Sequence, residues 1–80
     1  MTAQISRDLD TWLSVPLAVN AINRDGRQAR ILATLGVPGP AARIIKGSGS
    51  VPTPAQAIAL LNTERTQART RLVAAGVRLP

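Results

Sequence analysis

The sequence has no cysteine and no histidine, and Trp12 is its only aromatic residue. Without cysteine the chain can form neither a disulfide framework nor a thiolate metal site, and without histidine it lacks the commonest general acid–base side chain. Zinc fingers, thiol proteases and serine triads are therefore excluded. We expect no metal and no cofactor.

Long apolar runs are also missing. The longest ones, residues 15–19 and 57–61, are far shorter than the roughly 20 residues that a membrane-spanning helix needs. The first ten residues carry Arg7, Asp8 and Asp10 in place of the apolar segment of a secretion signal. We predict no membrane contact and a cytoplasmic protein, or a virion-associated one if the chain belongs to a phage particle.

Groups suited to catalysis are few. Asp8 and Asp10 are two positions apart, so on a helix they point in different directions and cannot act as a carboxylate pair. The segment 46–49, Lys-Gly-Ser-Gly, lacks the earlier glycines and the preceding strand of a phosphate-binding loop. We therefore expect that the protein is not an enzyme.

What the chain does have is positive charge, and most of it lies in the second half. The net charge is +6, and residues 41–80, with five Arg, one Lys and one Glu, supply +5 of it. Lys and Arg neutralise phosphates, so this imbalance favours a polyanionic partner, with nucleic acid first. The alternative is a basic surface that only keeps the protein soluble.

Helix signals dominate, and we predict a single all-α domain over residues 1–80, a small bundle of four to five helices. Thr2 can cap a first helix over residues 3–13, with Ile5, Leu9 and either Trp12 or Leu13 on its inner face. Pro16 is expected to break this helix, and a second helix, capped by Ser14, should run to about Asn23.

The middle of the chain reads as two short helices. Asp25-Gly26 predicts a turn in which glycine allows a positive φ, followed by a helix from Arg27 or Gln28 to Leu35 that Gly36 ends. A second short helix covers about residues 39–46, and residues 47–50, Gly-Ser-Gly-Ser, form a loop.

The last helix is long. Thr53 is its N-cap, Pro54 its first residue and Gly76 its end. Arg65 interrupts its apolar face, so the helix either bends or ends near Thr63, or Arg65 extends to the edge of the core. The residues that share that face are Ile58, Leu61, Ala68, Leu72 and Ala75.

The stretch of residues 26–61 resembles the helix-turn-helix of small Cro and lambda-repressor-like proteins of the YdaS type. The likeness rests on residues at the two helices and the turn between them: Gly26, Gln28, Ala29, Ile31, Leu35, Gly36, Val37, Pro38, Ala42, Ile45, Gly47, Val51 and Pro52. In this family the second helix lies in the major groove of DNA. The resemblance implies that Ile31 and Leu35 face the core and that Ala42 and Ile45 face the first helix of the pair.

The resemblance implies a DNA-binding transcriptional regulator of phage, prophage or plasmid type, with double-stranded DNA as its partner. Base or phosphate contacts would come from Arg43 and Lys46 on the second helix. The full set of DNA-binding candidates adds residues at the first helix and the loop: Arg27, Arg30, Arg43, Lys46, Ser48 and Ser50.

The sequence departs from the family in two ways. Leu32 stands where the family prefers alanine, and residues 39–46 contain only two polar side chains. An ordinary α-hairpin is therefore the alternative, in a small helical assembly protein that docks on a larger complex, such as a phage particle component or an inhibitor of a host protein. The seam of Leu61, Ala68, Leu72 and Ala75 would either join two copies or complete an intramolecular core.

Overall fold

A computed structural model describes residues 2–35 and 39–79 of the chain. Within these residues there are four helices and no strand: α1 (Ala3–Arg24), α2 (Arg27–Thr34), α3 (Pro40–Gly47) and α4 (Pro54–Ala74). The expected all-α fold with a long C-terminal helix is confirmed. The predicted turn at 36–38, with Gly36 as a helix end, lies outside the described residues.

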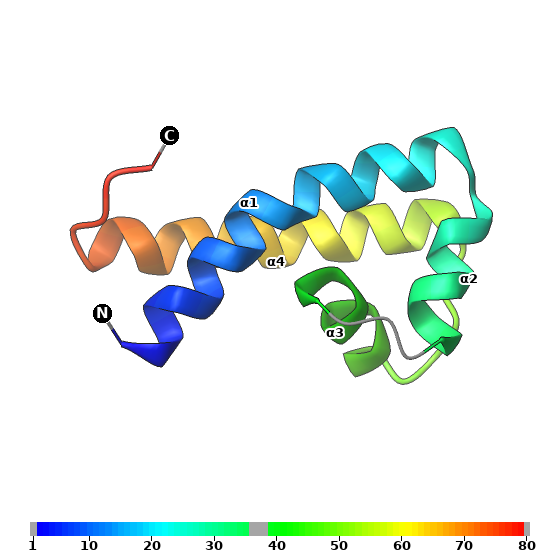
Figure 1. The fold of residues 1–80 in the computed structure, drawn as a ribbon, viewed down its shortest axis with the longest axis horizontal. Helices are drawn as coiled ribbons and strands as arrows, with labels where there is room; N and C mark the ends of the chain where they lie inside the picture. The colour runs from blue at the N-terminus through cyan, green and yellow to red at the C-terminus, as the bar shows by residue number, and fades with distance from the viewer. Residues whose placement is uncertain (1, 36–38, 80) are drawn as a thin grey trace.

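Two long helices form the frame of the molecule. Figure 1 shows α1 and α4 side by side and running in opposite directions, with α2 and α3 gathered toward one end of the pair. The molecule is elongated, with extents of 37 × 21 × 16 Å. All four helices contribute to the main core cluster, which consists of Val15, Ile22, Ala29, Ala41, Ile45, Ala57 and Leu61.

Helix α1 continues through Pro16, so the predicted break there, and the role of Ser14 as a cap, are wrong. Proline has no N–H, and the carbonyl oxygen of Trp12, four residues earlier, therefore loses its helical donor. Arg65 of α4 replaces that donor, because its Nε lies 3.2 Å from the Trp12 oxygen. Figure 1 shows α1 as a bent helix, which is what an internal proline produces.

Arg65 has a second contact with the same residue. Its guanidinium carbon lies 3.6 Å from the centroid of the Trp12 ring, a cation–π arrangement. Helix α4 is continuous across this position. Of the two predicted explanations for Arg65, the one in which it reaches the edge of the core is therefore correct.

The inner face of α1 differs from the predicted one. The buried residues are Asp8, Thr11, Val15 and Ile22. Leu13 is 57 % exposed, and the other predicted core residues, Ile5, Leu9 and Trp12, are only partly buried. The prediction treated residues 3–13 as a separate helix, whereas in one continuous helix the inward face is the one that Val15 and Ile22 share.

The predicted N-cap of α1 and both predicted ends of α4 are confirmed. Thr2 accepts a hydrogen bond from the Ile5 amide, and Thr53 forms a capping box with Gln56. At the end of α4, Gly76 has φ +78°, the Gly76 amide bonds the Val73 carbonyl and the Val77 amide bonds the Leu72 carbonyl. This is a Schellman motif, which requires the left-handed conformation that glycine supplies.

The turn between α1 and α2 also forms as expected, although the reason for its glycine differs. Asp25 Oδ1 accepts the Arg27 amide at 3.1 Å, which is an Asx turn. Gly26 has φ −58°, so it needs no positive φ. A Cβ at this position would lie 3.0 Å from Pro54 Cγ, a tight contact that would press on the Pro54 ring. The close approach of the turn to the start of α4 therefore favours glycine.

Candidate functional site

Helix α3 exposes two cations on the side opposite its buried face. Ala41, Ala42 and Ile45 are buried, as predicted for Ala42 and Ile45, and they fix the helix in the core. Arg43 and Lys46 are exposed and three positions apart, so they project from the same side of the helix. Among the described residues neither forms an ion pair. Helix α3 therefore presents uncompensated positive charge to solvent.

The loop after α3 begins at Ser48, one residue later than the predicted start, because Gly47 still belongs to the helix. Ser48 Oγ lies 2.7 Å from the Ile45 carbonyl oxygen and 3.2 Å from that of Ser50. Its single proton is therefore used within the turn, and Ser48 is poorly placed to donate to a phosphate.

Ser50 remains close to one of the exposed cations. Lys46 and Ser50 line one shallow hollow of about 290 Å³, together with Ala33, Gly49 and Val51. The structure thus joins Lys46 and Ser50 of the predicted set into one surface, which receives contributions from α2, α3 and the loop.

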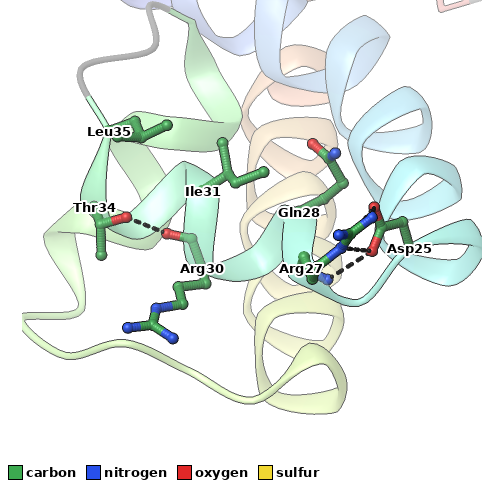
Figure 2. Close-up of a pocket in the computed structure, with 7 residues that line it drawn as sticks. All are labelled: Asp25, Arg27, Gln28, Arg30, Ile31, Thr34 and Leu35. Atoms are coloured by element: carbon green, nitrogen blue, oxygen red, sulfur yellow. Dashed lines mark hydrogen bonds and ion pairs between the residues drawn. The ribbon is translucent and has the colours of Figure 1, made fainter.

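On α2, the two predicted arginines differ. Arg27 forms a two-pronged ion pair with Asp25, with Nε 3.0 Å from Oδ1 and a terminal nitrogen 3.0 Å from Oδ2. The hydrogen bonds from the Arg27 side chain and amide hold the pKa of the Asp25 carboxyl below its usual value. In Figure 2 the Arg30 side chain points away from this pair, and Arg30 is exposed. Arg30 is therefore the better candidate for an anion contact.

A larger open hollow of about 560 Å³ lies along the same helix (Figure 2). Ile31 and Leu35, which were expected to face the core, line this hollow, and Leu35 is 55 % exposed. The prediction is wrong because α2 ends at Thr34 and Leu35 continues in an extended conformation. The inward positions belong to Ala29, which is buried, and to Leu32 and Ala33, which pack against the core.

The predicted partner seam on α4 lies mostly inside the molecule. Leu61, Ala68 and Leu72 have no exposed surface, while Ala75, the C-cap of α4, is exposed. Burial of the first three supports the alternative in which the seam completes an intramolecular core.

Sequence reasoning missed an ion pair between the two long helices. Asp8 is 3 % exposed. Both of its oxygens accept from Arg71, with a shortest distance of 2.9 Å, and Gln4 donates at 3.1 Å. The hydrogen bonds from Arg71 lower the pKa of the Asp8 carboxyl, although burial acts in the opposite direction. The available signal was the helical spacing of Asp8 with Thr11 and Val15, which places a carboxylate on the core face.

Neither a metal site nor a membrane helix is found in the part of the chain that the structure describes. Residues 2–35 and 39–79 contain no group of three or more potential ligands among His, Cys, Asp and Glu. In the same residues, no helix combines the length and the apolar character needed to cross a bilayer.

Comparison of the chain with known protein families, with curated proteins and with solved structures finds no match in any of the three.

Proposed function

We propose that the protein is a small, non-enzymatic DNA-binding protein, a regulator of phage, prophage or plasmid type, that places α3 against the DNA duplex. The observation that supports this most strongly is the arrangement of α3. Its inner face is fixed by Ala42 and Ile45, while Arg43 and Lys46 project outward without a carboxylate partner among the described residues. A rigidly held helix with cations on its outer face suits contact with DNA.

The candidate residues take different roles in this proposal. Arg43, near the middle of α3, bonds a guanine edge in bidentate fashion or holds a phosphate. Lys46, with Ser50 beside it in the same hollow, holds a phosphate, and Arg30 adds a contact from α2. Arg27 and Ser48 contribute less, because Asp25 compensates the charge of Arg27 and the Ser48 hydroxyl proton is used by backbone carbonyls.

The proposal is tested by fluorescence anisotropy of a labelled random duplex at several salt concentrations. The native chain should bind, with an affinity that falls steeply as salt rises. The double variant Arg43→Ala/Lys46→Ala should bind more weakly, and the slope of log K against log salt should fall by up to about 2 if both residues contact phosphates.

A matched control removes the same charge elsewhere. Arg69 and Arg78 are exposed and lie on α4 and beyond its end, so Arg69→Ala/Arg78→Ala should change the slope much less. Equal effects of the two double variants would show only a general attraction of a basic protein to DNA. An unchanged duplex affinity in the Arg43/Lys46 variant would refute the role of α3.

A second candidate function is that of a small assembly protein that docks on a larger complex. It is favoured by the hollow on α2, where Leu35 is 55 % exposed and Ile31 forms a second apolar wall. This function predicts a protein complex that is insensitive to salt and weakened by Leu35→Asp. It also predicts no duplex binding at low salt, the condition under which the first proposal expects the tightest binding.

A further inference from the structure

Helix α1 carries a second stripe of residues on the side that faces away from the core. Its members are spaced alternately by four and three positions: Ser6, Asp10, Leu13, Leu17, Asn20 and Arg24. All six are exposed. This 3.5-residue spacing is the pattern by which helices pack along a common seam. We call these six residues the outer stripe.

The centre of the outer stripe is apolar although it faces solvent. Leu13 is 57 % exposed and Leu17 is 71 % exposed. Neither belongs to the core cluster or to the residues packed against it. Two neighbouring leucines on the solvent face of a helix leave apolar surface in water that a partner helix would cover.

The charges of the outer stripe indicate which partner fits. Asp10 lies toward its N-terminal end and Arg24 at its C-terminal end. Among the described residues, neither forms an ion pair within the chain. When two copies of the stripe pack antiparallel, Leu13 of each copy meets Leu17 of the other and Asp10 lies opposite Asn20. Arg24 lies one turn farther on, opposite Ser6, so Asp10 of each copy and Arg24 of the other form a diagonal pair of opposite charges. A parallel arrangement would instead set Asp10 against Asp10 and Arg24 against Arg24.

We infer that the protein forms an antiparallel, two-fold symmetric homodimer through the outer stripe of α1. The contact is isologous, because each copy supplies both the acidic end and the basic end. It leaves the buried seam on α4 and the exposed cations of α3 untouched, so it does not rest on the proposed DNA binding.

The shape of α1 sets the strength of this dimer. α1 bends at Pro16 and lies along α4 (Figure 1), and helices that wrap a core are convex toward solvent. Two convex faces meet over only a few turns around the leucines. An interface of this size falls in the weak, transient class, so the dimer should form at micromolar to millimolar rather than nanomolar concentrations.

Sedimentation equilibrium tests the dimer at protein concentrations from about 10 μM to 1 mM. The ionic strength is set to about 0.15 M, because salt at this concentration limits the repulsion between the two basic chains. The native chain should show a monomer–dimer equilibrium. Leu17→Lys should raise the dissociation constant at least about ten-fold, because it puts a charge at the centre of the contact. The control is Val73→Lys on α4, at a residue as exposed as Leu13, 57 %, which should leave the equilibrium unchanged.

Charge reversal tests the antiparallel register. Asp10→Arg alone sets like charges together and should weaken the dimer at least about three-fold, as should Arg24→Asp alone. The double variant Asp10→Arg/Arg24→Asp restores both pairs in an antiparallel dimer and should recover most of the native affinity. In a parallel dimer each single reversal would only exchange one like-charge pair for another, so neither single variant would weaken the dimer.

Circular dichroism of every variant checks that the monomer keeps its helices, which is expected because all substituted positions are exposed. The inference is overturned if the native chain remains monomeric up to 1 mM, if Leu17→Lys dimerises like the native chain, or if the double charge reversal does not recover what the single reversals lose.

Discussion

Asp8 occupies a position on the core face of α1, and a buried carboxylate there is stable only with a partner. Its exposure is 3 %, and unpaired burial of a charge is costly. Arg71 supplies three hydrogen bonds from α4 while its own side chain stays 47 % exposed. The pair is therefore asymmetric: without its partner, the Arg71 side chain can be hydrated, whereas the buried Asp8 carboxylate cannot.

This asymmetry predicts unequal effects of removing the two partners. Arg71→Met leaves Asp8 with Gln4 as its remaining donor and should lower the free energy of unfolding by about 2–3 kcal/mol at pH 7. Asp8→Asn leaves a half-exposed arginine and should cost about 1 kcal/mol. Urea unfolding measures both, with the exposed Arg69→Met as control. Equal losses would contradict the asymmetry.

The same pair gives a pH dependence. Hydrogen bonds from Arg71 lower the folded pKa of Asp8 below its ordinary 3.8. The unfolded chain therefore takes up this proton first, so the stabilisation is complete above about pH 4 and is lost as the pH falls through the lowered folded pKa. In Arg71→Met, acid neutralises the unpaired carboxylate. The free energy of unfolding that this variant loses relative to the native chain should therefore become smaller below about pH 4. A deficit that grows in acid would contradict this account.

At the scale of elements, the continuity of α1 depends on a residue of α4. Pro16 deprives the Trp12 carbonyl of its donor, and Arg65 Nε replaces that donor. A proline in a helix interior normally costs about 3 kcal/mol. Part of that cost is offset here by a contact between residues 53 positions apart in the sequence.

A double-mutant cycle can isolate this compensation. Arg65→Ala should destabilise the native chain by about 1–2 kcal/mol, through loss of the hydrogen bond and the ring contact. In the Pro16→Ala background the backbone amide gained at position 16 can serve the Trp12 carbonyl, so Arg65→Ala should cost at least about 0.5 kcal/mol less. Thermal or urea unfolding of the four proteins gives the coupling free energy between Arg65 and Pro16. Strictly additive effects would mean that Arg65 acts only through the Trp12 ring.

At the scale of the whole molecule, the four helices share a small core rich in alanine. Of the seven residues in the main cluster, Ala29, Ala41 and Ala57 are alanines, which allow close helix approach but bury little area. A chain of 80 residues with such a core is expected to have only about 3–5 kcal/mol of stability. Each large core side chain therefore carries a sizeable share of it.

Leu61 tests this margin. It has no exposed surface and belongs to the cluster that joins all four helices. Leu61→Ala should cost about 2–5 kcal/mol, enough to leave a large fraction of molecules unfolded near 37 °C. The control, Leu35→Ala at a 55 % exposed position, should stay within about 0.5 kcal/mol. A well-folded Leu61→Ala variant would show that the core is less marginal than its composition indicates.

Local chemistry in the sequence determined the helix ends and the turns. Thr2, Thr53 and Gly76 form the predicted caps, and Asp25 forms the predicted turn, because a cap depends on residues within one turn of itself. The helical class followed equally from spacing, and the inward placement of Ala42 and Ile45 on α3 followed from the helix-turn-helix resemblance.

Only the tertiary structure decided whether α1 breaks and which residues its core face contains. Nothing near Pro16 in the sequence supplies the donor that Arg65 brings from α4, and nothing near Asp8 supplies Arg71. In the candidate site, the Asp25–Arg27 pair is a local contact, whereas the hollow that Lys46 and Ser50 share with Ala33 of α2 depends on how the helices pack. Helical periodicity defines which side chains share a face. Contacts between residues distant in the chain decide which partner packs against that face. They therefore also set the free energy that each residue on it contributes to folding.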